Sequence, residues 1–181
     1  MSDDVPELHR PLATDRVTTA GIAWDVTATP EECAAIAARL MEPGVDALAC
    51  HFELHRPLGT GAGAVLATGR GGRSGEIVAK GRLRARLQRV CVVTLEVFPV
   101  ELDEEFRVVF VPEGQESEAD DPDADDEVPY KGTVLDLGEA AVEQLALSLD
   151  PYPRKPGAEL PPEANDEPEG PFAALARLSR Q

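Results

Sequence analysis

A cluster of positive side chains is the feature of this sequence best suited to chemistry. Between residues 69 and 90 lie seven basic residues and one acid, Glu76, in a chain of 181 residues whose formal net charge is −17. The seven are Arg70, Arg73, Lys80, Arg82, Arg84, Arg86 and Arg89. Guanidinium and ammonium groups gathered on one surface bind phosphate, so the cluster predicts contact with RNA or another anionic partner. The alternative is that these side chains only solvate the outer face of a sheet, paired with acids on neighbouring strands.

The spacing within residues 80–88 indicates how the cations are positioned. Four of them recur at every second residue, so in an extended strand they share one face at intervals of roughly 6.6 Å. The residues between them are Gly81, Leu83, Ala85 and Leu87, which we expect to face the core. No aromatic residue interleaves with these cations, so the pattern predicts phosphate contacts with little sequence preference.

The remaining reactive side chains form no catalytic or metal-binding pattern. His51 and His55 fall on a predicted strand, where residues four apart lie about 13 Å from each other, too far for one zinc ion. The three cysteines, Cys33, Cys50 and Cys91, are odd in number and widely spread, which is typical of reduced thiols in the cytoplasm. We therefore expect no catalytic residue, no metal, no cofactor and no small-molecule substrate, and the protein is not predicted to be an enzyme.

An acidic segment, residues 113–129, carries nine acids and no base. Its aspartates at 121, 123 and 125 have the spacing of a calcium-binding loop. However, Asp126 stands where that loop needs glycine and Gly132 where it needs glutamate. Like-charge repulsion and the scarcity of apolar residues predict a disordered, solvated loop.

Hydrophobic periodicity predicts the elements that position these groups. We expect helices over 30–41, where Thr29 and Glu32 form a capping box behind Pro30, and over 136–149, capped by Asp136. Expected strands cover 15–28, 46–56, 76–89, 91–98 and 104–111, with a bend at Phe98-Pro99 between the last two. The fold class is α+β: an antiparallel, partly curled sheet of five or six strands packed by two helices.

The chain is expected to form one domain, residues 1–150, followed by a tail. Residues 151–171 hold seven prolines, typical of a semi-extended linker, and an amphipathic helix using Phe172, Leu175 and Leu178 is expected after it. The glycine-rich stretch 59–75 predicts a mobile loop. The hexapeptide ELHRPL occurs at 7–12 and 53–58, either as a duplicated unit or, as we favour, by chance. The acidic N-terminus and the absence of a long apolar run predict a cytoplasmic protein without a membrane span.

Several segments together resemble the YceD family, proteins described by their part in the accumulation of large-subunit ribosomal RNA. They are TPEECAAIAARL, GRLRARLQRVCVVTLEVFPVELDEEF, the acidic segment, and above all LDLGEAAVEQLALSLDPYPRKPGAEL. The resemblance covers about residues 7–160 and implies a function in ribosome biogenesis, with no catalytic residues to carry over. Many members have two cysteines separated by two residues in the middle strand. Here Cys91 matches the first and Thr94 replaces the second, so a metal or redox role of that pair is not expected.

Two functional hypotheses follow. In the first, the protein is a non-enzymatic factor that binds ribosomal RNA, or a large-subunit precursor, through the seven cations. In the second, it is an adaptor or chaperone whose acidic loop holds a basic ribosomal protein, and the cations only solvate the sheet.

Overall fold

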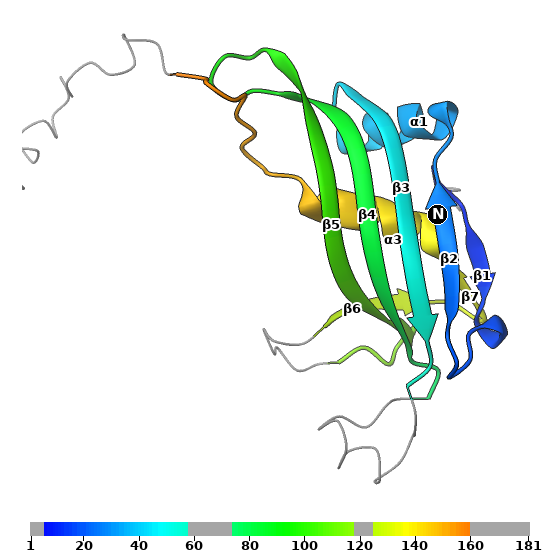
Figure 1. Cartoon of the computed structure of the whole chain (residues 1–181). Coiled ribbons are helices and arrows are strands. Elements are labelled where there is room, and N and C mark those ends of the chain that lie inside the picture. The colour runs from blue at the N-terminus through cyan, green and yellow to red at the C-terminus, as the bar shows by residue number, and fades with distance from the viewer. Residues whose placement is uncertain (1–5, 58–73, 118–124, 160–181) are drawn as a thin grey trace, which may run out of the picture.

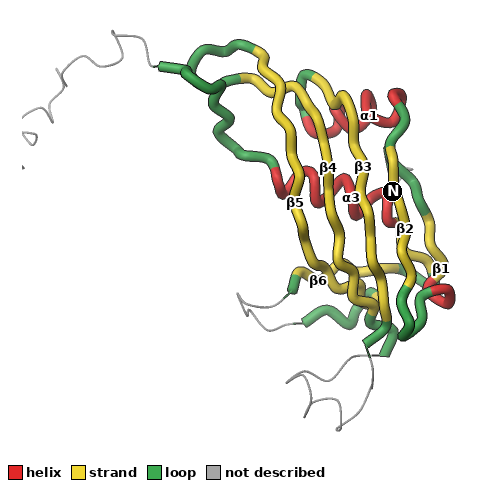
Figure 2. Tube along the Cα trace, in the orientation of Figure 1, coloured by secondary structure: helices red, strands yellow, loops and turns green. Residues whose placement is uncertain are grey.

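The structure, a computed structural model, describes residues 6–57, 74–117 and 125–159. Within these ranges the chain forms an open five-stranded sheet, a separate two-stranded sheet, two α-helices and one 3₁₀ turn (Figures 1 and 2). The strands are β1 Pro11–Ala13, β2 Ile22–Thr27, β3 Gly44–His55, β4 Ile77–Val90, β5 Val97–Pro112, β6 Asp126–Tyr130 and β7 Val134–Asp136. The helices are α1 Pro30–Leu40 and α3 Leu137–Ser148, and the 3₁₀ turn is Thr14–Arg16. No helix among the described residues is long and apolar enough to cross a membrane.

The predicted α+β class is confirmed, but the sheet is mixed, not purely antiparallel. Its strand order is β2-β3-β4-β5-β6, and β6 runs parallel to β5 while the other neighbours are antiparallel. The β1 and β7 strands pair with each other away from this sheet. Figure 1 shows α3 crossing behind the long strands and covering one face of the sheet. The opposite face is exposed along most of β4 and β5, except at one end, where Val78, Val109 and Val111 form a small buried cluster.

Both helices begin where the sequence predicts. The Thr29 side chain accepts a hydrogen bond from the Glu32 N–H and the Glu32 carboxylate accepts one from the Thr29 N–H, which completes the capping box of α1. At the start of α3, Asp136 accepts from the N–H groups of Gly138 and Glu139. The covered face of the sheet, with the buried sides of both helices, forms a single core in which Leu83, Ala85 and Leu87 are buried as expected.

The predicted strand 91–98 and the bend at Phe98-Pro99 are wrong, whereas the predicted strand 104–111 is confirmed as part of the longer β5. Residues 91–96 form the turn of a hairpin, and β5 continues without interruption from Val97. Leu95 closes the turn in the left-handed conformation, at φ 60°, and the Cys91 N–H donates to the Glu96 carbonyl. Pro99 fits inside β5 because prolines are tolerated where the missing N–H faces an open sheet edge.

The end of the acidic segment forms regular structure, contrary to the prediction of disorder. Residues 118–124 lie outside the described residues, but Asp126–Tyr130 forms the parallel strand β6. Val128 and Tyr130 pack against the core, and the Tyr130 hydroxyl donates to the Gly75 carbonyl over 2.8 Å. The acidic composition alone predicted too little apolar burial to offset the loss of backbone conformational entropy on folding. These two apolar contacts offset that loss. The predicted C-terminal helix also lies outside the described residues.

Candidate functional site

Four of the seven predicted cations form a row on the solvent-facing side of β4. Lys80, Arg82, Arg84 and Arg86 are all exposed, and the residues between them are buried. The row arises because side chains alternate across a strand and the intervening residues are apolar or glycine. Gly81 is required within this pattern, since a Cβ there would lie 2.1 Å from the Phe106 ring.

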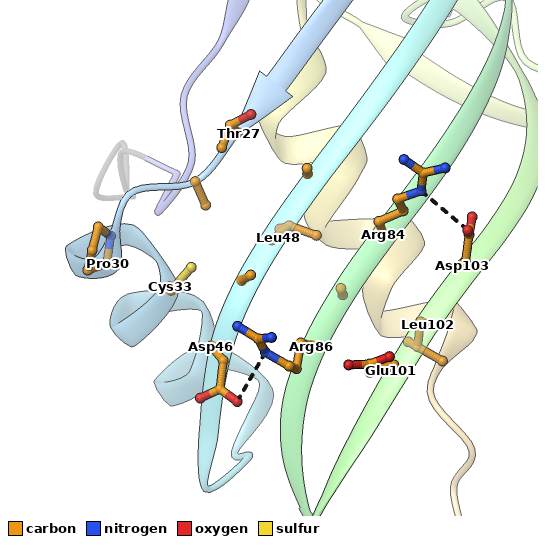
Figure 3. Close-up of a pocket in the computed structure, with 14 residues that line it drawn as sticks. Thr27, Pro30, Cys33, Asp46, Leu48, Arg84, Arg86, Glu101, Leu102 and Asp103 are labelled. Carbon is orange, nitrogen blue, oxygen red and sulfur yellow. Dashed lines mark hydrogen bonds and ion pairs between the residues drawn. The ribbon is translucent and has the colours of Figure 1, made fainter.

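Acids on the neighbouring strands largely neutralise this row. Asp103 of β5 accepts two hydrogen bonds from Arg82, at 2.6 and 2.9 Å. It also accepts one from Arg84 Nε at 3.2 Å (Figure 3). The bonds from Arg82, followed by those from Arg84, hold the pKa of the Asp103 carboxyl below its usual range. By strand register, the solvent face of β2–β5 carries five cations, Lys80, Arg82, Arg84, Arg86 and Arg107, and six acids, Asp25, Asp46, Glu53, Glu101, Asp103 and Glu105. Cross-strand pairing, the alternative raised by the sequence, is therefore present.

A hollow lies on this face beside two of the arginines. It has a volume of about 470 Å³, and its lining includes Ala47 and Ala49 of β3 together with Arg84 and Arg86 (Figure 3). The space exists because the β3 side chains are small and β2 ends at Thr27, opposite Ala49. Arg84 reaches Asp103 through Nε, and Arg86 Nε lies 3.9 Å from Asp46. The side chains of both arginines are more than half exposed, at 63% and 57%.

Arg89, one of the seven predicted cations, does not share the exposed face of the row. This residue faces the opposite side of β4 and is 7% exposed. Its Nε forms an ion pair with Glu42 at 2.9 Å, and its Nη2 donates to the Asp150 carbonyl. The odd position of Arg89 in a strand whose even positions face solvent is the sequence signal for this burial. Arg70 and Arg73 lie outside the described residues.

The sequence analysis missed the acids that control the exposed arginines. Glu101, Asp103 and Glu105 recur at every second residue of β5 and fall opposite Arg86, Arg84 and Arg82. Their period of two is the signal that could have found them. The predicted strand begins at residue 104, so Glu101 and Asp103 fall outside it.

The hairpin turn after β4 holds Cys91 in a polar setting. The Cys91 sulfur is buried and accepts from the N–H groups of Val93 and Lys155, each at 3.4 Å. The Thr94 hydroxyl first, then these amides, lower the pKa of the Cys91 thiol to about 7. Thr94 thus stabilises the thiolate. Among the described residues, no group of three or more His, Cys, Asp or Glu side chains is arranged to hold a metal ion.

Ionisation of Cys91 should couple protein stability to pH. The folded pKa of about 7 lies below the ordinary thiol value of 9.0. The contribution of the Cys91 thiolate to the stability of the folded state is therefore fully present above pH 9, and it is lost as the pH falls through 7. We expect the stability of the wild type relative to Cys91→Ala to be greater at pH 9 than at pH 6, measured by urea unfolding. Cys50→Ala is the control, because burial raises the pKa of Cys50 to about 12 and its thiol stays protonated over this range. If the difference in stability between the wild type and Cys91→Ala is the same at pH 6 and pH 9, the pKa of Cys91 is not lowered in the folded state.

Comparisons with known proteins agree with the resemblance found in the sequence. Searches of curated proteins and of solved structures found no match. A family model described as "Large ribosomal RNA subunit accumulation protein YceD" matches residues 79–179. The match covers more than half of the chain and includes β4, with its arginines, and the Cys91 turn. The chain therefore belongs to the YceD family, whose name links it to the accumulation of large-subunit ribosomal RNA.

Proposed function

We propose that this protein supports the accumulation of large-subunit ribosomal RNA by contacting RNA phosphates with the solvent face of its sheet. The residues assigned to this contact are Lys80, Arg84 and Arg86. The observation that carries the proposal is the hollow beside Arg84 and Arg86. Its lining combines the two guanidinium groups with small side chains of β3 and with the carboxylates of Asp46, Glu101 and Asp103. A phosphate there would meet nitrogen donors of both arginines, the geometry that favours guanidinium for phosphate binding.

The proposed contact is narrower than the sequence suggests. Arg82 is held by two hydrogen bonds to Asp103, and Arg89 is buried, so neither is assigned to RNA. The acids on the same face should keep the affinity modest. Three phosphate contacts predict a log–log salt slope of about −2 to −3, at about 0.7 to 0.9 per neutralised phosphate.

Replacing Lys80, Arg84 and Arg86 together with glutamine should abolish measurable RNA binding while preserving the fold, because all three side chains are exposed. The probe is a fluorescently labelled single-stranded RNA of 20 nucleotides. Its binding is measured by fluorescence anisotropy at increasing salt concentrations. The matched control replaces Lys131, Arg154 and Lys155, three exposed cations elsewhere, so the change in net charge is identical. Equal RNA affinity for the triple variant and the wild type would refute the proposal.

A second candidate function is an adaptor that holds a basic ribosomal protein through the acidic segment. It is favoured by one contact: Asp125, within that segment, pairs with Arg107 of β5 at 3.1 Å, so a carboxylate of this segment engages an arginine. The same triple variant separates the two candidates. Loss of RNA binding with normal levels of large-subunit ribosomal RNA in cells would support the adaptor.

A further inference from the structure

One edge of the five-stranded sheet is open over most of its length. The β5 strand spans sixteen residues, Val97–Pro112, but β6 pairs only with Val108–Pro112. At the other end, the segment after α3 meets the hairpin turn, where the Val92 N–H donates to the Pro153 carbonyl. Residues 99–107 of β5 therefore have no strand partner on their outer side within the described part of the chain.

The backbone along this edge is arranged to pair with another strand. The bond from the Cys91 N–H to the Glu96 carbonyl fixes the alternation of the β4–β5 ladder, which continues without a register shift. In an antiparallel pair only alternate residues bond to the partner, so residues 101, 103, 105 and 107 direct N–H and C=O groups to the open side. Pro99 falls in the same series, which explains how β5 accommodates a residue without an N–H.

Apolar side chains beside the edge are left partly uncovered. Val100, Leu102 and Phe106 point to the core side of β5 and are only partly buried. Figure 1 shows the C-terminal end of α3 emerging from behind the sheet next to β5, and Leu147 in its last turn is 72% exposed. A further strand beside β5 would extend the sheet over these groups and bury them.

The negative charge along the open edge of β5 determines which kind of partner can bind there. Glu101, Glu104 and Glu105 are exposed along it, and Glu105 lies 3.7 Å from Arg82 with 80% of its side chain accessible. Glu104 points to the core side, a placement that discourages pairing with unrelated strands. Two copies of this edge would set acid against acid, and RNA would be repelled. A basic strand paired with β5 would instead place its positive side chains beside glutamates on both faces of the sheet.

We propose that the open edge of β5, residues 99–107, binds a basic, extended segment of a partner protein by strand addition. Main-chain hydrogen bonds supply affinity that is independent of sequence, while the three glutamates and the half-buried apolar residues select alternating basic and apolar side chains. Glu101, Leu102 and Asp103 of this edge also line the hollow at Arg84 and Arg86. The strand-addition proposal rests on main-chain groups of β5, which the RNA proposal does not use, so neither depends on the other.

The test uses the full chain and a labelled ten-residue peptide of alternating arginine and valine. Glu105→Pro removes an N–H from the open side without removing one from the β4–β5 ladder, and we expect it to weaken peptide binding by about tenfold or more. Glu105→Ala is the matched control, which loses the same carboxylate but keeps the N–H, and it should weaken binding by about threefold or less. Hydrogen exchange should show protection of the amides of residues 101–107 on peptide binding to the wild type.

A second variant keeps the test decisive if Glu105→Pro does not fold. Glu104→Lys changes an exposed side chain and reverses its charge, so it should weaken binding of the basic peptide by about tenfold. Equal peptide affinity for Glu105→Pro and Glu105→Ala, unchanged binding by Glu104→Lys, or protection confined to other residues would overturn the proposal. RNA affinity, measured on the same variants, should not fall, so failure of either proposal is recognised separately.

Discussion

Replacing Gly138 with alanine should destabilise the protein by about 3 kcal/mol, although the same change in an exposed helix normally stabilises it. Gly138 lies in the first turn of α3, which packs against the chain before β1. A Cβ at this position would lie 2.1 Å from the Leu8 carbonyl oxygen and 2.7 Å from its carbon. Because these atoms are backbone, they cannot turn aside as a side chain can. The helix must move away, which would strain the bonds that Asp136 makes to α3 and to the Arg10 N–H.

Gly44→Ala is the matched control for this prediction. Its Cβ would meet only Gln88 side-chain atoms, at 3.7 and 3.9 Å, which is ordinary contact. We expect its free energy of unfolding to stay within about 1 kcal/mol of the wild type, measured by urea titration. A Gly138→Ala protein as stable as Gly44→Ala would show that α3 does not pack on Leu8 as described.

Replacing Arg89 with methionine should destabilise the protein by about 3–5 kcal/mol, because it leaves Glu42 without its partner in a nearly buried position. The exposed fractions of the two side chains are only 8% and 12%. The pair joins the end of β4 to the turn after α1, and the bond from Arg89 to the Asp150 carbonyl adds the segment after α3. Three elements are therefore joined at one guanidinium.

Two further variants test whether burial is the cause. Arg86→Met changes an exposed arginine of the same strand, 3.9 Å from Asp46, and should alter the stability by less than about 1 kcal/mol. The double variant Arg89→Met with Glu42→Leu removes both charges, so it should recover much of the stability that Arg89→Met loses. If Arg89→Met and Arg86→Met unfold at the same urea concentration, the buried ion pair is not a stabilising contact.

Local sequence signals predicted both helices well. Thr29, Pro30 and Glu32 mark the start of α1, and Asp136 marks that of α3, because a helix start depends on side chains within three residues of it. The alternation in β4 likewise predicted which cations face solvent, since it needs only the period of a strand. Family membership was also readable from sequence segments, and the family model confirms it.

Predictions that depended on composition or on a single residue were less accurate. Proline at position 99 suggested a bend, but its effect depends on whether its missing N–H faces a partner strand or an open edge. The acidic composition of 113–129 suggested disorder throughout, yet its last residues belong to β6, where Val128 packs against the core. Neither outcome can be read from neighbours in the chain.

The sequence by itself determined the class of fold, the family, the helix boundaries and the exposed row of cations, because each depends on local patterns. Only the tertiary structure decided which charges are available. Asp103 lies nineteen residues from Arg84, and Glu42 lies forty-seven residues from Arg89, yet each carboxylate contacts its arginine. The strength of a charge depends on what lies within a few ångströms of it and on its access to water, and strand pairing sets both. Strand pairing likewise leaves the acidic edge of β5 open, a property that belongs to the sheet and to no single residue.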